Sequence, residues 1–251
     1  MHTAKVTGPV RAVVSRRGCL AGLAWAIAAP AQAVAVADAA SGAPEVLPPA
    51  AARYLALGAA SKTGSTDWTL VRNRQRIALA KGDVFEEIWH RDDAGRISLQ
   101  RCFHSHQQVV HYSAGELITL GVQPDWGQLG RLVDVRDGVL QAEPGEAVGS
   151  PWGGVQRLHG HVNADRVTVD WLPAWQLPLR LHRQGRLGQR LTLTLQALTA
   201  TLPAGAAQPG ERAARYQILD AADFGDMPHE PVVRLCQLMD QQQGWRTAHA
   251  H

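Results

Sequence analysis

The sequence predicts an α+β domain built on a largely antiparallel sheet. Three successive segments alternate apolar and polar residues with a period of two, which is typical of strands with one face on a core and the other in water. Segments with helical spacing lie near the start, the middle and the end of the chain, and no internal repeat separates them. The apolar positions of the three strands are Val167, Val169 and Trp171, then Leu177, Leu179 and Leu181, then Leu191, Leu193 and Leu195.

Residues 1–33 have the layout of a bacterial export signal. A basic head without acidic residues precedes a weakly hydrophobic, alanine-rich segment that ends in a small-x-small cleavage site at 31–33. The paired Arg16 and Arg17 resemble a twin-arginine signal. Cys19 stands where that motif usually has an aromatic residue, so an ordinary secretory signal is the alternative. We therefore expect a periplasmic or otherwise exported protein.

Removal of this signal changes the charge balance. The chain has 25 Lys plus Arg and 22 Asp plus Glu, but residues 1–33 hold four of the bases and none of the acids, so 21 bases face 22 acids in the rest. A nucleic-acid partner would require excess clustered base, which is missing. The apolar run is short for a bilayer, so we expect no transmembrane anchor after processing. The composition predicts a flexible leader over 34–46, a single exported domain over 47–247 and a tail over 248–251.

Three helices are predicted to cover the sheet. Two prolines before AAARYLALG predict a helix over 50–58, and Asp125 is a candidate cap for a helix within 122–135. Pro231 opens a helix over 231–242. Further extended segments are expected at 68–80 with a break at Asn73, in a hairpin over 84–106 around the DDAG turn, and at 108–113, 154–162 and 216–219.

A histidine-rich strand face is a candidate metal site. If 97–106 is a strand, then Cys102, His104 and His106 share one side of it, and His159 and His161 form a second pair at the same spacing. Imidazole suits zinc and copper, and a thiolate favours copper(I) or zinc, so copper or zinc is the only cofactor that the sequence suggests. The alternative is that these histidines are simply polar surface residues.

The other reactive residue types form no recognisable catalytic motif. The sequence has no nucleophile elbow, phosphate loop or HExxH helix, so a non-enzymatic protein is favoured. Asp220, Asp223 and Asp226 suit caps and turns better than a calcium loop. Cys102 and Cys236 either form a disulfide or are separate buried thiols.

The segment VDWLPAWQLPLRLHRQGRLGQRLTLTLQAL, at 169–198, resembles the later sheet of the Lol-type periplasmic lipoprotein carriers and their sensor relatives. In both, a Trp-containing strand turns through a Leu-Pro step into a strand that carries an arginine, here Arg180, and then into a Thr/Leu strand. The resemblance implies a curved, mainly antiparallel, half-barrel-like sheet covered by a few helices, which binds acyl chains or other apolar ligands in its concavity. The histidines and the DAADFGDM segment lie outside this pattern, so no particular cargo is implied.

Two functions follow as hypotheses. If the helices cover the apolar strand faces incompletely, the remaining space is an apolar pocket, whereas complete cover would make an ordinary core. The first hypothesis is a non-enzymatic exported binding protein for a lipid, another apolar ligand or an exported protein partner. The second is an exported metal-handling protein that uses the histidine-rich strand face. The expected pocket residues are Val167, Val169, Trp171, Leu179, Leu181 and Leu193.

Overall fold

The computed structural model describes residues 46–58, 64–136, 139–143, 148–162, 164–186, 188–243 and 245. The expected export signal, the leader up to residue 45 and the tail lie outside the described residues. The described chain forms one curved sheet of 13 strands, with the order β13-β6-β5-β4-β3-β2-β1-β12-β11-β10-β9-β7 and with β8 paired to β9. All pairings are antiparallel except the parallel pair of β13 and β6. The predicted α+β class with a mainly antiparallel half-barrel is therefore confirmed.

Most of the strands precede or follow two short helices in the middle of the chain, and the longest helix comes last. The first strands are β1 (Ala50–Gly58), β2 (Ser65–Arg72), β3 (Arg76–Lys81), β4 (Phe85–Arg91), β5 (Ile97–Phe103) and β6 (Gln108–Tyr112). Two short helices follow, α1 (Ala114–Thr119) and α2 (Trp126–Arg131), and then β7 (Leu140–Ala142), β8 (Val148–Ser150), β9 (Gly153–Val162), β10 (Asp165–Leu172), β11 (Leu177–Gln184) and β12 (Arg190–Thr199). The chain continues through the 3₁₀ helix η1 (Arg212–Arg215), β13 (Gln217–Asp220), the 3₁₀ helix η2 (Ala221–Gly225) and α3 (Pro231–Gln242).

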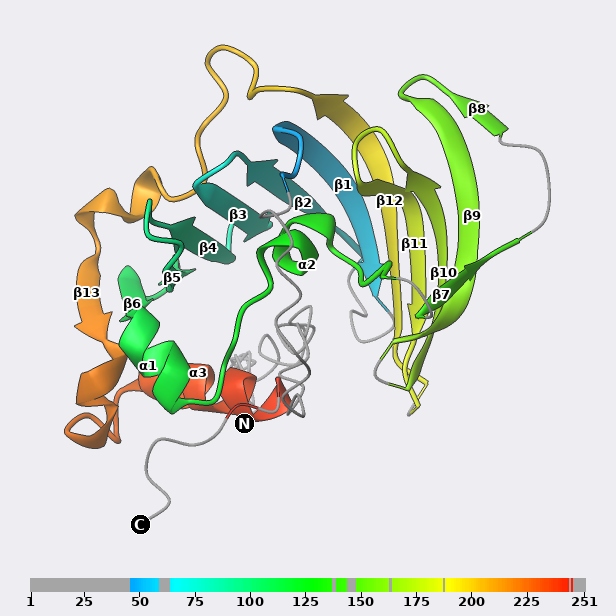
Figure 1. Ribbon diagram of the computed structural model, residues 1–251. Coiled ribbons are helices and arrows are strands. Elements are labelled where there is room, and N and C mark those ends of the chain that lie inside the picture. Colours follow the sequence, from blue (N-terminus) through cyan, green and yellow to red (C-terminus); the bar gives the residue numbers. More distant parts are fainter. Residues whose placement is uncertain are drawn as a thin grey trace, which may run out of the picture.

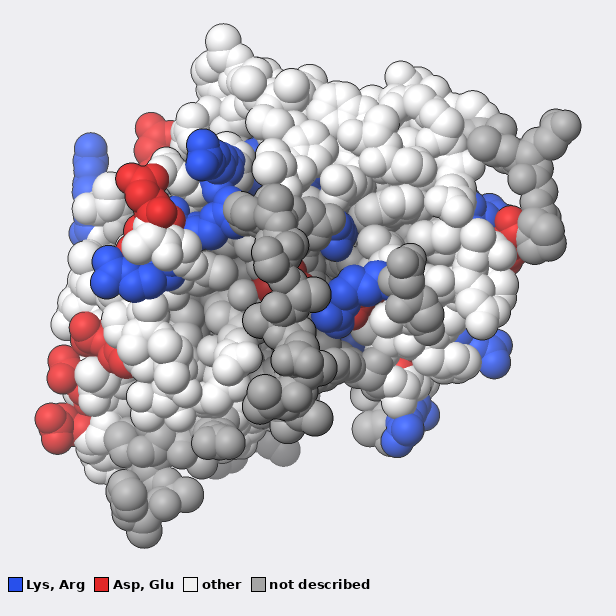
Figure 2. All heavy atoms as spheres, viewed as in Figure 1, with Lys and Arg blue, Asp and Glu red and all other residues white. Residues whose placement is uncertain are grey.

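The sheet curves around α2, which lies in its hollow, while α1 and α3 lie beside the strands at the β6 end (Figure 1). Figure 2, from the same side, shows that few charged side chains lie over β1 and β12, whereas more of them gather toward β13 and beside α2. No helix within the described part of the chain has the length and hydrophobicity needed to cross a membrane.

The predicted helix over 50–58 is wrong, because these residues form β1 in the middle of the sheet. Alanine, leucine and arginine are good helix formers, but β1 pairs with β2 on one side and with β12 on the other. Ala52, Tyr54 and Ala56 are buried while Arg53 and Leu57 are exposed, which is the two-residue period of a strand. Tertiary pairing has overridden the local propensity.

The three-strand block lies where the alternation predicts it. Val169 pairs with Leu181, and Leu181 pairs with Leu193, so one buried row crosses three strands. An irregularity after Asp170 places Trp171 opposite Pro178, and Leu179 is only half-buried as a result.

The sheet buries side chains on both faces. The concave face carries the large core, which includes Cys236 of α3, whereas the convex face carries a small cluster that contains Cys102. Both cysteines are buried and free. The open question of a disulfide is thereby answered, since the two thiols belong to separate cores.

Arg72 of β2 fixes α2 in the hollow. Its buried guanidinium donates to the backbone carbonyl of Gly130 in α2 and to those of Trp175 and Gln176 in the β10–β11 turn. A side chain at Gly130 would collide with Leu47, so glycine permits this close approach. Burial lowers the pKa of Arg72 to about 10, because only neutral carbonyl groups accept these hydrogen bonds.

Candidate ligand-binding pocket

A pocket opens between α2 and the concave face of the sheet. One wall comes from β3 and β4 with Ile77, Leu79 and Trp89. β2 and β1 separate these strands from β9 to β12, which supply the facing wall, so the curvature of the sheet brings the two walls together (Figure 1). The facing wall consists of Val162, Val167, Leu181 and Leu191, while Leu129, Leu132 and Val133 of α2 and its exit, together with Trp245, complete the apolar lining.

The pocket is narrow and mostly apolar. Its cavity volume is about 60 Å³ within a depression of about 870 Å³ that includes the open mouth. A single water needs roughly 10–15 Å³ of such space, so the cavity is larger than a one-water packing defect. An apolar lining with a few polar groups at its edge is typical of sites for apolar ligands.

The expected pocket residues are divided between the pocket and the core. Val167 and Leu181 line the pocket. Val169, Trp171 and Leu193 are buried in the concave core, and half-buried Leu179 packs against the same core.

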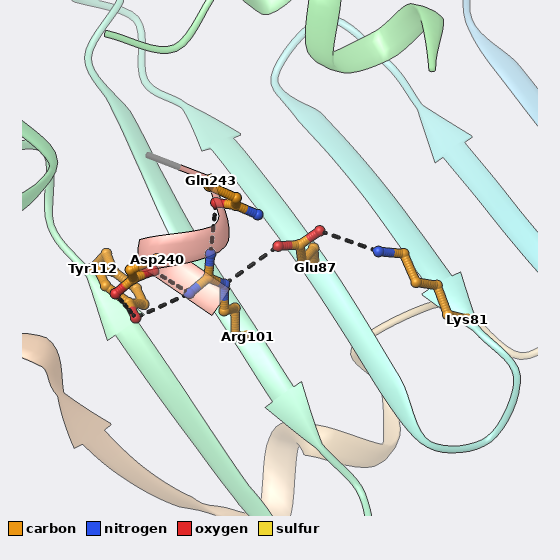
Figure 3. A network of polar contacts seen from close by, with 6 residues as sticks. All are labelled: Lys81, Glu87, Arg101, Tyr112, Asp240 and Gln243. Atoms are coloured by element: carbon orange, nitrogen blue, oxygen red, sulfur yellow. Dashed lines mark hydrogen bonds and ion pairs between the residues drawn. The ribbon is translucent and has the colours of Figure 1, made fainter. Parts of the chain in front are cut away.

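A buried polar network borders the pocket (Figure 3). Its centre is Arg101 of β5, which is 0 % exposed and donates to Glu87 at 3.3 Å and to Asp240 of α3 at 2.5 Å. The same guanidinium donates to Gln243 at 3.0 Å and lies over the ring of Trp245 at 4.8 Å. Glu87, Gln243 and Trp245 belong to the pocket lining, so the network connects the pocket to the end of α3.

The network keeps its charges paired. Burial alone would lower the pKa of Arg101, but Tyr112, Asp240 and Glu87 raise it well above its usual value. Arg101 therefore remains a cation. Lys81 lies 3.7 Å from the other oxygen of Glu87, and although burial lowers the pKa of Lys81, the carboxylate opposes that shift.

The other charged groups in and beside the pocket lining are also paired. Asp134 accepts from the guanidinium of Arg136 at 2.9 and 2.6 Å, and these bonds hold the pKa of Asp134 below its usual value although burial acts in the opposite direction. Arg183 donates to Asp165 at 2.6 Å. Each carboxylate in the described lining therefore has a basic partner, and the pocket offers an apolar ligand a surface without an unpaired acid.

The predicted metal ligands do not share a strand face. His104 and His106 lie in the turn at 104–107 rather than on β5, so the expected alternation ends at Phe103. His104 is buried on the side of Cys102, with its ring nitrogens 3.2 Å from Glu86 and 3.1 Å from the hydroxyl of Tyr216. The ring of His106 instead stacks edge-on against Phe103, which belongs to the concave core.

Among the described residues, no group of three or more His, Cys, Asp or Glu side chains is placed to hold a metal ion. Burial and the nearby Glu86 raise the pKa of Cys102 to about 12, which disfavours the thiolate that a metal would bind. Copper or zinc binding by Cys102, His104 and His106 stays a prediction, and metal analysis of the purified protein beside its His104→Ala/His106→Ala variant would test it.

The acidic segment before α3 has a structural role. Asp220 caps η2 by accepting from the backbone N–H of Ala222 at 3.2 Å. This is the cap that the sequence favoured over a cation site.

Sequence reasoning missed the contribution of β3, β4 and the Arg101 network to the pocket. Arg101 lies on the same face of β5 as Leu99 and Phe103, so a charge within an apolar strand face was the available signal. Its partners Asp240 of α3 and Gln243, the C-cap of α3, are 139 and 142 residues away in sequence, and no local pattern links them to it.

No known family profile and no curated protein matches the sequence. Similar solved structures include an uncharacterised conserved protein from Thermus thermophilus, with 14% identity and a TM-score of 0.35 over 69% of this chain and 90% of that one. MucB in complex with MucA(peri) has 10% identity and a TM-score of 0.37 over 68% of this chain and 56% of MucB. A putative outer membrane lipoprotein-sorting protein domain from Vibrio parahaemolyticus has 9% identity and a TM-score of 0.29 over 65% of this chain and 88% of that one. The chain spans less than two thirds of MucB, and its resemblance to the lipoprotein-sorting fold is weak.

Proposed function

We propose that the protein is a non-enzymatic, exported binding protein that holds the apolar part of a ligand, such as an acyl chain, in the concave pocket. The observation that carries this proposal is the apolar space between α2 and two facing walls of the sheet. Close packing is the rule inside proteins, so an apolar space that remains open to the surface is a candidate binding site.

The electrostatics of the pocket support an apolar ligand. Glu87 and Asp134 are held by Arg101 and Arg136, so neither needs a charged ligand as a partner. The apolar side chains between them gain stability when an apolar ligand displaces water from their surface. The small cavity volume favours a slim, flexible chain over a bulky ring system.

A substitution that fills the pocket with a larger side chain tests the proposal. We expect the protein to bind a neutral naphthylamine dye, and Leu129→Trp to weaken this binding at least about tenfold, because the indole would occupy the space. The measurement is a fluorescence titration, accompanied by mass spectrometry of an organic extract of the purified protein.

Leu235→Trp is the matched control. Leu235 is also a half-buried helical leucine packed on the concave core, but it does not line the pocket. The affinity of the Leu235→Trp variant for the dye should differ from that of the parent protein by less than about twofold. Equal losses in both variants, or no binding by the parent protein, would contradict a ligand pocket at this place.

Export is the second part of the proposal, and the layout of residues 1–33 supports it. In a bacterial host we expect the full chain to appear in the periplasmic fraction in its shortened form. Arg16→Lys/Arg17→Lys keeps the charge and should block only a twin-arginine route. Normal processing of this variant would point to the ordinary secretory route, and an unprocessed parent chain in the cytoplasm would refute export.

A further inference from the structure

A second candidate site lies on the convex face of the sheet, where β9 and β11 end and β10 begins. A groove of about 260 Å³ is lined there by His161, Arg166, Gln184 and Arg186. This groove is separate from the concave pocket, because none of its lining residues lines that pocket.

Strand register places three of these side chains in one row. Arg166 of β10 pairs with His161 of β9 on one side and with Gln184 of β11 on the other. All three are exposed, while the adjacent Val162 and Val167 are buried on the opposite face. Directly paired side chains on one face lie about 5 Å apart, which is close enough to act on one ligand.

A tight turn brings the fourth side chain to the same groove. Gly185 donates to the carbonyl of Gln189 at 2.8 Å, and Gly188 donates to that of Gly185 at 3.0 Å. Gly188 has a φ of +81°, and a Cβ at Gly185 would meet the Gln189 side chain at 2.6 Å. The two glycines thus allow the turn that holds Arg186 beside the row. Figure 2 shows basic side chains projecting at the lower tip of these strands.

The groove is rich in hydrogen-bond donors for which the described part of the chain supplies no acceptor. Within the described residues, His161, Arg166, Gln184 and Arg186 make no ion pair and no side-chain hydrogen bond, and no carboxylate lines the groove. Asp165 is the acid beside Arg166 in sequence, but it is held by Arg183. Among the described residues, no carboxylate lines the groove beside these two guanidinium groups, so their charge favours the binding of an anion.

We propose that this groove binds a phosphate group. The planar guanidinium group of arginine matches the spacing of two phosphate oxygens. Two guanidinium groups, together with the imidazole of His161 and the amide of Gln184, offer donors in several directions. A tetrahedral phosphate can use more of these donors than a planar carboxylate can. The phosphate belongs either to a soluble phosphate compound or to a lipid headgroup, and the two sources share this chemistry.

Titration with inorganic phosphate at fixed ionic strength tests the site, by calorimetry or by NMR shifts of the arginine side chains. We expect saturable binding, and we expect Arg166→Gln/Arg186→Gln to weaken it at least about tenfold, because both guanidinium groups are lost. Arg180→Gln is the matched control, since Arg180 is an exposed arginine on β11 that does not line the groove. It should change the affinity less than about twofold. Absence of saturable binding, or equal losses in the two variants, would overturn the proposal.

Vesicles distinguish the two sources of phosphate. Cosedimentation with phosphatidylcholine vesicles that contain phosphatidylglycerol, lost in Arg166→Gln/Arg186→Gln and competed by inorganic phosphate, would assign the site to a lipid headgroup. Binding of inorganic phosphate without vesicle binding would assign it to a soluble compound. Dye binding in the concave pocket should be unchanged in all these variants, so a failure of the phosphate site is distinguishable from a failure of the proposed function.

Discussion

At the scale of single residues, Arg101 joins the sheet to the last helix. It is fully buried, and its hydrogen bonds reach Glu87 of β4 and Asp240 of α3 (Figure 3). Arg101→Leu would leave both carboxylates buried without their main cation, so we expect it to lower the free energy of unfolding by about 3–5 kcal/mol. Urea denaturation followed by circular dichroism measures this change.

Arg96→Leu serves as the control for Arg101→Leu. Arg96 also pairs with a carboxylate, Asp92, but its side chain is 75% exposed. Exposed pairs stabilise a protein by about 0–1 kcal/mol, so this variant should unfold nearly as the parent does. A similarly small effect of Arg101→Leu would mean that water reaches Glu87 and Asp240.

The two described cysteines should be inert in the folded protein. Burial raises the pKa of Cys102 to about 12 and that of Cys236 to about 11, and only the thiolate is a nucleophile. At pH 8 we expect no alkylation of either residue by iodoacetamide without denaturant, and full alkylation of both in urea. Peptide mapping by mass spectrometry locates the label, and rapid native labelling of Cys236 would show that α3 opens readily.

At the scale of elements, α1 depends on its capping box. The hydroxyl of Ser113 accepts from the backbone N–H of Glu116, and the Glu116 carboxylate accepts from that of Ser113. Ser113→Ala should destabilise the protein by about 1 kcal/mol in thermal or urea unfolding. Ser105→Ala is the control, because Ser105 is an exposed turn residue that caps no helix. Equal stability of the two variants would contradict a capping role.

The sequence predicts those elements whose pattern is decided locally. The strands at 165–199 and the helix at 231–242 follow from their apolar spacing, and Asp125 marks the start of α2. β1 differs from the predicted helix, because its helix-forming residues are held in a strand by pairing with β2 and β12. The expected strand face also ends early, because β5 stops at Phe103 and His104 lies in the following turn. The pocket could be predicted only in part, since Val167 faces Trp89 across the hollow through the curvature of the whole sheet.

At the scale of the whole molecule, β1 connects the two halves of the chain. It pairs along its length with β2 and with β12, so the N-terminal and C-terminal strands form one continuous sheet. We expect a single cooperative unfolding transition, in which tryptophan fluorescence and far-ultraviolet circular dichroism coincide in urea. Two separate midpoints would show that the halves fold independently.

Within the described residues, the unclosed sheet ends in short strands on both sides. β13 has four residues at one side, and β7 and β8 have three each at the other, although the inner β9 and β12 have ten each. An edge strand can pair with extended segments of other chains through its unpaired backbone N–H and C=O groups. A short edge strand offers few of these groups. An open half-barrel of this design can keep its hollow accessible and still resist growing, strand by strand, into a fibre.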